Sequence, residues 1–177
     1  MSTLQLLLLV VLTAIAVAAS AHSWRTKQAY GLFRFLGFEA LAAVIAWNAS
    51  RWLREPLSIP QLASWAILAA ATVLAAHGVH LLKVAGRARA RIMEETQYVV
   101  EAGAYRYIRH PLYSSLVLLG WGVFFKGRDL PSAALALAAT AFFVATARYE
   151  EDFNIQRFGS AYSEYMKRTK MFIPFLL

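Results

Sequence analysis

Two groups of polar side chains adjoin apolar stretches in the C-terminal half of the chain. The first group, Arg109-His110-Pro111-x-Tyr113, opens a stretch that carries no Asp, Glu, Lys or Arg up to residue 125. The second, Arg148-x-Glu150-Glu151, follows the uncharged residues 130–147. An antiparallel helical hairpin of the two stretches would place both groups at the same end. Cationic, phenolic and carboxylate groups gathered there could bind a polar ligand with charges of both signs.

The first group has the features of a helix start that binds anions. Pro111 suits the first turn of a helix, where its missing N–H is not needed. The unpaired N–H groups of that turn attract a carboxylate or phosphate, and Arg109 adds a planar cationic fork. A membrane anchor with a helix-starting proline is the alternative. It does not explain why Tyr105, Tyr107 and Tyr113 lie so close together.

The second group supplies negative charge. Glu150 and Glu151, with Arg148 close by, could bind an ammonium group and a pair of ribose hydroxyls. A solvated charged face after a membrane helix is the alternative, and for an isolated Glu-Glu pair it is the commoner explanation. The functional interpretation therefore depends on the two groups meeting in space.

The composition predicts an all-α integral membrane protein. The chain has 177 residues, of which 59% are hydrophobic and 16% charged, whereas soluble domains have about a quarter charged residues. A membrane-spanning helix needs about 20 mostly apolar residues. Residues 1–24, 31–52, 56–82, 110–125 and 130–147 are the candidates. We therefore expect five transmembrane helices in one domain that comprises residues 1–177.

The basic residues predict how the chain is oriented in the membrane. The net charge of +8 would suggest nucleic acid in a soluble chain, but the membrane explains it here and no nucleic acid is expected. Alternate connecting segments hold 14 and 4 of the 18 Lys and Arg residues, with Arg34 counted in the first loop. The positive-inside bias then places the N-terminus outside. It places the C-terminus, with a helix that follows Arg148, in the cytoplasm. In a prokaryote the membrane would be the inner membrane, and the first helix is expected to be retained rather than cleaved.

The order of the motifs resembles a known superfamily. The chain contains Gly-x-Tyr-Arg-Tyr-x-Arg-His-Pro-x-Tyr, an apolar hairpin, Arg-x-Glu-Glu, Phe-Gly-x-x-Tyr-x-x-Tyr from Phe158 to Tyr165, and a late proline, Pro174. This order is similar to that of the isoprenylcysteine carboxyl methyltransferase and phospholipid N-methyltransferase superfamily of integral membrane methyltransferases. The resemblance covers about residues 99–174. Ser115 and Ala104 stand where the family often has glycine and proline.

The resemblance implies S-adenosylmethionine as the methyl donor and assigns roles to residues. The positions that it implies for cofactor binding are Tyr105, Arg109, His110, Pro111, Tyr113, Glu150 and Glu151. It implies that Arg148 faces the reacting group, as a catalytic and substrate-binding residue.

The expected activity is methyl transfer to a lipophilic acceptor, such as the carboxylate of a prenylated cysteine or a similar lipid. A carboxylate acceptor needs only a cation to hold it, whereas an amine would need Glu150, Glu151 or His110 to remove its proton. The partners would be the lipid bilayer and this acceptor. A sterol-type reductase that uses NADPH and a non-catalytic lipid-binding scaffold are the alternatives.

A few polar residues lie outside the resemblance. Glu39 is an ionisable group inside an apolar helix, where it either lines the substrate pocket or makes a structural hydrogen bond. His77 and His80 share a helix face, but no third ligand accompanies them, so a structural role is favoured and no metal is expected. The absence of cysteine excludes disulfides and thiolate metal sites. Three arginines just inside the membrane are expected to contact phospholipid headgroups on the cytoplasmic side, with a substrate role as the alternative: Arg87, Arg89 and Arg91.

Overall fold

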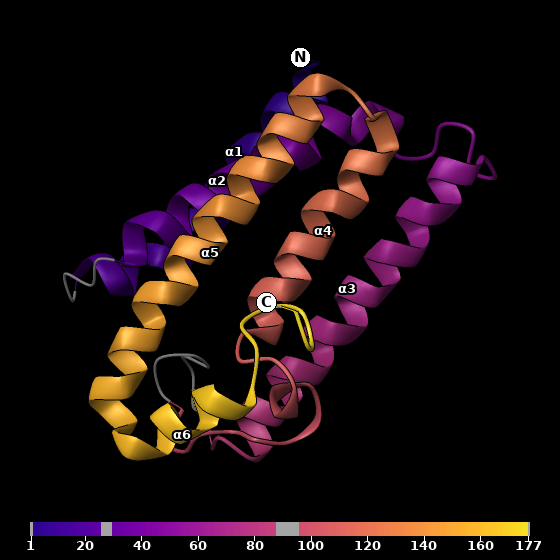
Figure 1. Ribbon diagram of the computed structural model, residues 1–177. Helices are drawn as coiled ribbons and strands as arrows, with labels where there is room; N and C mark the ends of the chain where they lie inside the picture. The colour runs from indigo at the N-terminus through magenta and orange to yellow at the C-terminus, as the bar shows by residue number, and fades with distance from the viewer. Residues whose placement is uncertain (1, 26–29, 88–95, 177) are drawn as a thin grey trace.

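The computed structural model describes residues 2–25, 30–87 and 96–176, and Arg89 and Arg91 fall outside these ranges. The described chain is helical apart from loops and one isolated parallel bridge between Ile108 and Lys170. Its α-helices are α1 (Thr3–Arg25), α2 (Tyr30–Asn48), α3 (Ile59–Val84), α4 (Pro111–Gly127), α5 (Leu130–Phe158) and α6 (Ser160–Arg168). Two short 3-10 helices, η1 (Ala49–Arg51) and η2 (Gly103–Arg106), join them (Figure 1). The expected all-α fold is confirmed.

Four helices of the described chain are long and apolar enough to cross a membrane. These candidate spans are Thr3–Ala21, Tyr30–Arg51, Ile59–Val84 and Leu130–Phe158. Helix α4 has 17 residues, about 26 Å at 1.5 Å per residue, which is less than the roughly 30 Å of a bilayer core. The protein is therefore an integral membrane protein with four candidate spans, and the fifth span stays a prediction.

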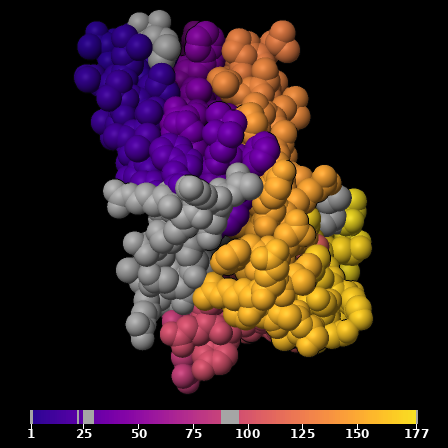
Figure 2. All heavy atoms as spheres, turned by 90° about the vertical axis from the view of Figure 1, so that its left-hand side faces the viewer, coloured from indigo at the N-terminus to yellow at the C-terminus, as the bar shows by residue number. Residues whose placement is uncertain are grey.

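The helices pack around α4 and α5. Helix α3 lies against α4, α2 lies against both α4 and α5, and α1 lies against α2 (Figure 1). Val44, Val123 and Phe143 are fully buried in the shared core. Gly37 permits the close contact of α2 with α5, since a Cβ there would lie 2.7 Å from the Phe143 ring. Helix α1 forms one edge of the molecule and leaves most of its side chains exposed (Figure 2).

The end of the bundle that carries α6 is closed by the C-terminal segment. Helix α5 continues without a break past Arg148 to Phe158, and Gly159 then reverses the chain with a positive φ of 60°. Residues 170–171 return beside the start of α4, where the backbone N–H of Arg109 donates to Lys170 O over 2.8 Å and that of His110 to Met171 O over 3.1 Å. We call this the α6 end, and the opposite end, where residues 128–129 join α4 to α5, the turn end.

Candidate functional site

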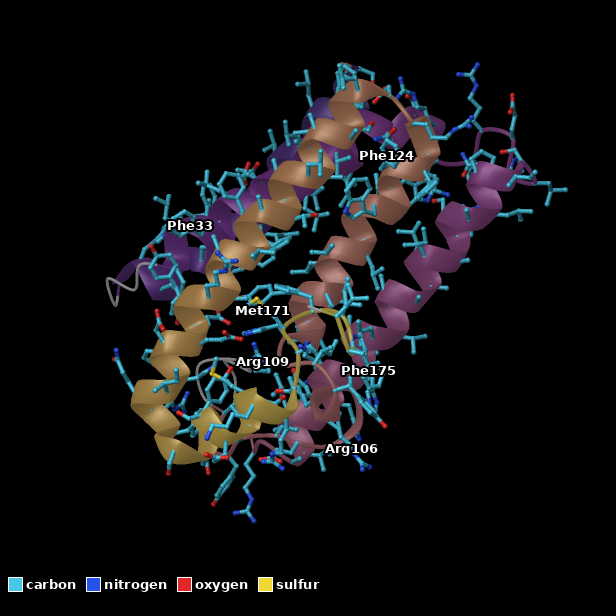
Figure 3. All side chains as sticks on the ribbon, viewed as in Figure 1. Phe33, Arg106, Arg109, Phe124, Met171 and Phe175 are labelled. Carbon is cyan, nitrogen blue, oxygen red and sulfur yellow. The ribbon has the colours of Figure 1, made fainter. Side chains whose placement is uncertain are left out.

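The two polar groups meet at the α6 end, as an antiparallel hairpin predicts. Arg109 Nε donates to Glu151 Oε1 over 2.6 Å, and His110 Nε2 lies 3.3 Å from the same oxygen. All three side chains are almost completely buried. The start of α4 is thus joined to the end of α5 by an ion pair that water does not screen. Arg109 is marked in Figure 3, beside the last part of α5.

Tyr113 and Glu150 form a second buried contact one turn further into the bundle. The Tyr113 hydroxyl donates to Glu150 Oε1 over 2.6 Å, and Tyr113 is only 1% exposed. The hydrogen bond fixes the direction of the carboxylate, which lines a pocket between the helices. The site therefore has one carboxylate that faces the pocket and a second, Glu151, that lies behind Arg109 and His110.

Arg34 brings a cation from α2 to this pair. Its Nη1 lies 3.9 Å from Glu150 Oε1. Its Nη2 donates to Ser23 Oγ over 2.5 Å and to Ala19 O over 3.2 Å, both in α1. Arg34 therefore links α1, α2 and α5. Its assignment to the first loop was wrong, because it lies inside α2 and is 4% exposed. Its position within an apolar helix was the signal that could have identified it.

Aromatic side chains form much of the wall of the pocket, which has a cavity volume of about 90 Å³. They come from α2, from residues 98–113 and from α5 and α6, and include Tyr30, Tyr98, Tyr105, Phe153, Phe158 and Tyr162. Arg109, His110 and Asn154 add polar groups to the wall. A planar ring could stack against such a wall, while a cationic group meets the Glu150 carboxylate.

The phenols around the pocket are neutral hydrogen-bond donors. Burial raises the pKa of Tyr162 to about 12, even though a hydrogen bond with Asn154 acts in the opposite direction. Burial, and then the Glu150 carboxylate, also raises the pKa of Tyr105. Burial raises the pKa of Tyr165, whose hydroxyl donates to Tyr105 O over 2.7 Å. At neutral pH these rings therefore add no negative charge to that of the carboxylates.

Arg109 is largely engaged by the protein itself. Besides the bond to Glu151, its Nη1 donates to Met166 O over 3.3 Å and to Thr169 O over 2.5 Å. Of the three guanidinium nitrogens of Arg109, Nε and Nη1 donate to these acceptors, and Nη2 has no acceptor among the described residues. The guanidinium thus holds the C-terminal segment against α5. Pro111 is buried in the first turn of α4, as its sequence position predicts.

Two of the predicted residues lie away from the pocket. Arg148 is exposed on α5 and does not line the pocket, so its catalytic and substrate-binding role stays a prediction. Glu39 Oε2 accepts a hydrogen bond of 2.9 Å from Thr13 Oγ1. This contact between α2 and α1 favours the structural alternative, and a role of Glu39 in substrate binding also stays a prediction.

His77 supports the loop before α4. His77 Nε2 accepts a hydrogen bond from Ala104 N over 3.4 Å. It also packs beside Gly103, which has a positive φ of 55° and no room for a Cβ. Within residues 2–25, 30–87 and 96–176, no three His, Asp or Glu side chains converge as metal ligands. Arg87 lies over the Tyr98 ring, 5.4 Å from its centroid, at the edge of the pocket wall.

Comparison with known proteins identifies relatives over most of the chain. The profile of the phospholipid methyltransferase family matches residues 60–161. A "Probable protein-S-isoprenylcysteine O-methyltransferase" of Oryza sativa subsp. indica is 29% identical over 170 residues, which cover 90% of this chain and 87% of the relative. "Protein-S-isoprenylcysteine O-methyltransferase B" of Arabidopsis thaliana is 31% identical over 98 residues, 55% of this chain and 46% of the relative.

A third relative has a different kind of name. "Methanethiol S-methyltransferase 2" of Bradyrhizobium diazoefficiens is 32% identical over 70 residues, which are 40% of this chain and 26% of the relative. No solved structure matches the chain. The family match begins in α3, so α2 with Arg34 precedes it.

Proposed function

The chain belongs to the phospholipid methyltransferase family, and from that premise we propose that it transfers a methyl group from S-adenosylmethionine to a lipophilic acceptor. The whole chain acts as one membrane domain. The observation that carries the proposal is the buried Tyr113–Glu150 contact at the wall of an aromatic pocket. Its hydrogen-bonded carboxylate offers negative charge to a cationic ligand, and the rings around it offer stacking surfaces.

The residues present fit S-adenosylmethionine by their chemistry. This cofactor combines an aromatic base, ribose hydroxyls, an amino-acid group and a sulfonium, and it supplies an activated methyl group when bound. Tyr105, Tyr162 and Phe153 offer ring faces, and Asn154 offers an amide to polar edges. Glu150 offers negative charge to the cationic groups. Nη2 of Arg109, which has no acceptor within the described ranges, is suited to a carboxylate.

The other site residues hold this arrangement. Glu151 keeps Arg109 and His110 in place, so that the start of α4 cannot move away from α5. The bridge between Ile108 and Lys170 holds the C-terminal segment over the same region. A site built in this way orients its ligands and excludes water, which is what a transfer from an already activated donor requires of the protein.

The acceptor is proposed to be the carboxylate of a prenylated cysteine or a similar lipid. The names of the rice and Arabidopsis relatives support this class. A carboxylate is nucleophilic without a base, and the proposed role of Arg148 is to hold it. The name of the Bradyrhizobium relative gives a thiol as its acceptor, so the acceptor has to be tested directly.

Purified full-length protein provides the test. Incubation with S-adenosylmethionine labelled in its methyl group and N-acetyl-farnesylcysteine should give a labelled methyl ester, whereas methanethiol should give little product. Failure of S-adenosylhomocysteine at millimolar concentration to raise the unfolding temperature would contradict the proposal. A rise with NADPH instead would support the reductase. Unchanged function in a folded Glu150→Gln variant would support the scaffold.

The proposal also places the α6 end at the cytoplasmic face and the N-terminus outside, and the distribution of Lys and Arg supports this. Because the chain has no cysteine, single Ser160→Cys and Leu57→Cys variants can be labelled cleanly. Both positions are exposed, at opposite ends of the bundle. In right-side-out vesicles an impermeant maleimide should label only the Leu57→Cys variant. Labelling of Ser160→Cys alone would reverse the orientation.

A further inference from the structure

A second polar cavity lies at the turn end, far from the site described above. It encloses about 310 Å³ between residues 51–61 and the last residues of α4. These two segments adjoin at the far ends of α3 and α4 in Figure 1. In Figure 3, Phe124 marks this end of α4, and Arg109 marks the α6 end. We call this cavity the basic pocket, because Arg51, Arg54, Lys126 and Arg128 line it.

All the basic residues of the two segments converge on this cavity. The segments that join helices at the turn end, residues 49–58 and 126–129, contain four basic residues, and all four line the basic pocket. Glu55, which also lines the basic pocket, and Asp129, which does not, are the acidic residues of the same segments. Four cations against two carboxylates give this end an excess of positive charge around one cavity.

Lys126 places a buried ammonium group in the wall of the basic pocket. Its residue is 6% exposed, and its Nζ donates to Gln61 Oε1 over 2.8 Å. The same nitrogen lies 3.3 Å from the centroid of the Trp65 ring and 5.4 Å from that of Trp52. Neutral groups therefore hold the ammonium, and within the described chain no carboxylate pairs with it.

Arg51, which lines the basic pocket, is paired with Asp129. They make an ion pair of 2.5 Å, and Trp47 Nε1 and Ser132 N also donate to the Asp129 carboxylate over 3.0 and 2.9 Å. Gln61 Nε2 donates to Arg51 O over 3.1 Å. The Asp129 charge is thus used by Arg51, and it does not neutralise the other cations.

Arg54 and Arg128 supply the exposed part of the positive charge. Both side chains are exposed, and neither has an acidic partner among the described residues. Arginine forks bind phosphate oxygens in pairs, and a lysine adds a point charge. Tryptophans such as Trp52 and Trp65 favour the level of the lipid headgroups. The chemistry of this cavity suits a phosphate ester.

We propose that the basic pocket binds the phosphate group of an anionic phospholipid headgroup. Arg54 and Arg128 grip the phosphate oxygens from the open side, while Lys126 provides a fixed charge in the wall. A zwitterionic lipid is disfavoured, because its ammonium group would enter a cavity with excess positive charge. The assignment is independent of the methyl-transfer proposal, since none of these residues lines the pocket at the α6 end.

Native mass spectrometry of the full chain in non-ionic detergent tests the assignment. Delipidated protein is titrated with phosphatidylglycerol or phosphatidylcholine, and bound lipid is counted. Wild type should retain phosphatidylglycerol in preference to phosphatidylcholine. The Arg54→Gln/Arg128→Gln variant should bind phosphatidylglycerol about 25-fold more weakly, at roughly fivefold per arginine. Lys167→Gln/Arg168→Gln, which removes two exposed charges at the α6 end, is the matched control and should bind like wild type.

Each outcome either distinguishes a lipid headgroup from free phosphate or rejects the proposed site. Displacement of phosphatidylglycerol by millimolar inorganic phosphate would assign the basic pocket to free phosphate, and retention would assign it to the lipid headgroup. Equal binding of the two lipids by wild type would overturn the proposal. So would a double variant that binds phosphatidylglycerol as wild type does. An unchanged unfolding temperature of the double variant shows that weaker binding is not a folding defect.

Discussion

The two ends of the bundle use charge in opposite ways. At the α6 end, Glu150 and Glu151 are buried beside Arg34, Arg109 and His110, so that the protein's own charges hold each other in place. At the turn end, Arg54 and Arg128 are exposed around an open cavity. The first arrangement suits a ligand that is itself of mixed charge and needs a fixed orientation. The second attracts an anion through net charge and requires little orientation. Helix α4 thus has a different kind of polar site at each of its ends.

The largest effect is expected from the cation at the α6 end. Replacing Arg34 by Met should leave Glu150 with less compensation in a buried place and cut the link between α1 and α5. Breaking a buried ion pair typically costs about 3–5 kcal/mol, so the unfolding temperature in detergent should fall by several degrees. Arg54→Met at the turn end is the control and should leave it unchanged. A double variant, Arg34→Met/Glu150→Gln, should recover part of the loss. Equal unfolding temperatures of Arg34→Met and wild type would show that the contact is not stabilising.

Glu150→Gln should have the next largest effect, on ligand binding rather than on folding. The amide keeps a hydrogen-bond acceptor for Tyr113 but removes the charge that faces the pocket. A hydrogen-bonded charge is worth about 1.5–3 kcal/mol, so S-adenosylhomocysteine should bind roughly 10- to 100-fold more weakly by calorimetry. Glu164→Gln, an exposed carboxylate on α6, is the matched control. Binding of S-adenosylhomocysteine within twofold of wild type by the Glu150→Gln protein would remove Glu150 from the cofactor site.

The sequence pattern could predict the meeting of the two polar groups at the α6 end, because it depends only on the order of apolar and polar segments. Apolar runs with a short turn between them predict a hairpin, and a hairpin brings residue 109 to residue 151 whatever the details of packing. Arg34 and Glu39 lie five residues apart and therefore do not share a face of α2. Glu39 indeed bonds Thr13 instead.

The contact of Arg34 with Glu150 could not be predicted in the same way. It depends on which face of α2 packs on α5, and the approach at Gly37 and Phe143 decides this. For the same reason the exposure of Arg148 does not follow from its place two residues before Glu150. A turn of α5 points one side chain into the bundle and the other outward. Whether α4 counts as a fifth span depends on about one helical turn of length, and composition does not determine helix length that closely.

High pH should weaken the α6 end through its tyrosines. Burial raises the pKa of Tyr162 from 10.0 to about 12. Because the folded protein holds the neutral form, this stability is fully present below pH 10 and is lost as the pH rises toward 12. The full difference is about 2.7 kcal/mol. Unfolding temperatures measured from pH 8 to 11.5 should fall less in Tyr162→Phe than in wild type, and Tyr149→Phe, which alters an exposed ring, should behave like wild type. Parallel curves for Tyr162→Phe and wild type would contradict the assignment.

The smallest effect that separates the two ends is their response to salt. Between about 0.05 and 0.5 M NaCl the Debye length falls from roughly 14 to 4 Å, which screens exposed charges but barely affects buried pairs. Retention of phosphatidylglycerol at the basic pocket should therefore weaken several-fold, because Arg54 and Arg128 face solvent. Binding of S-adenosylhomocysteine should change by less than twofold, because Glu150 is 7% exposed and fixed by Tyr113. Both constants can be measured on one preparation of wild type, with potassium glutamate in place of NaCl as a check for specific chloride binding. If the two ligands lose affinity in parallel, the distinction between a paired and an open charged site does not hold for this protein.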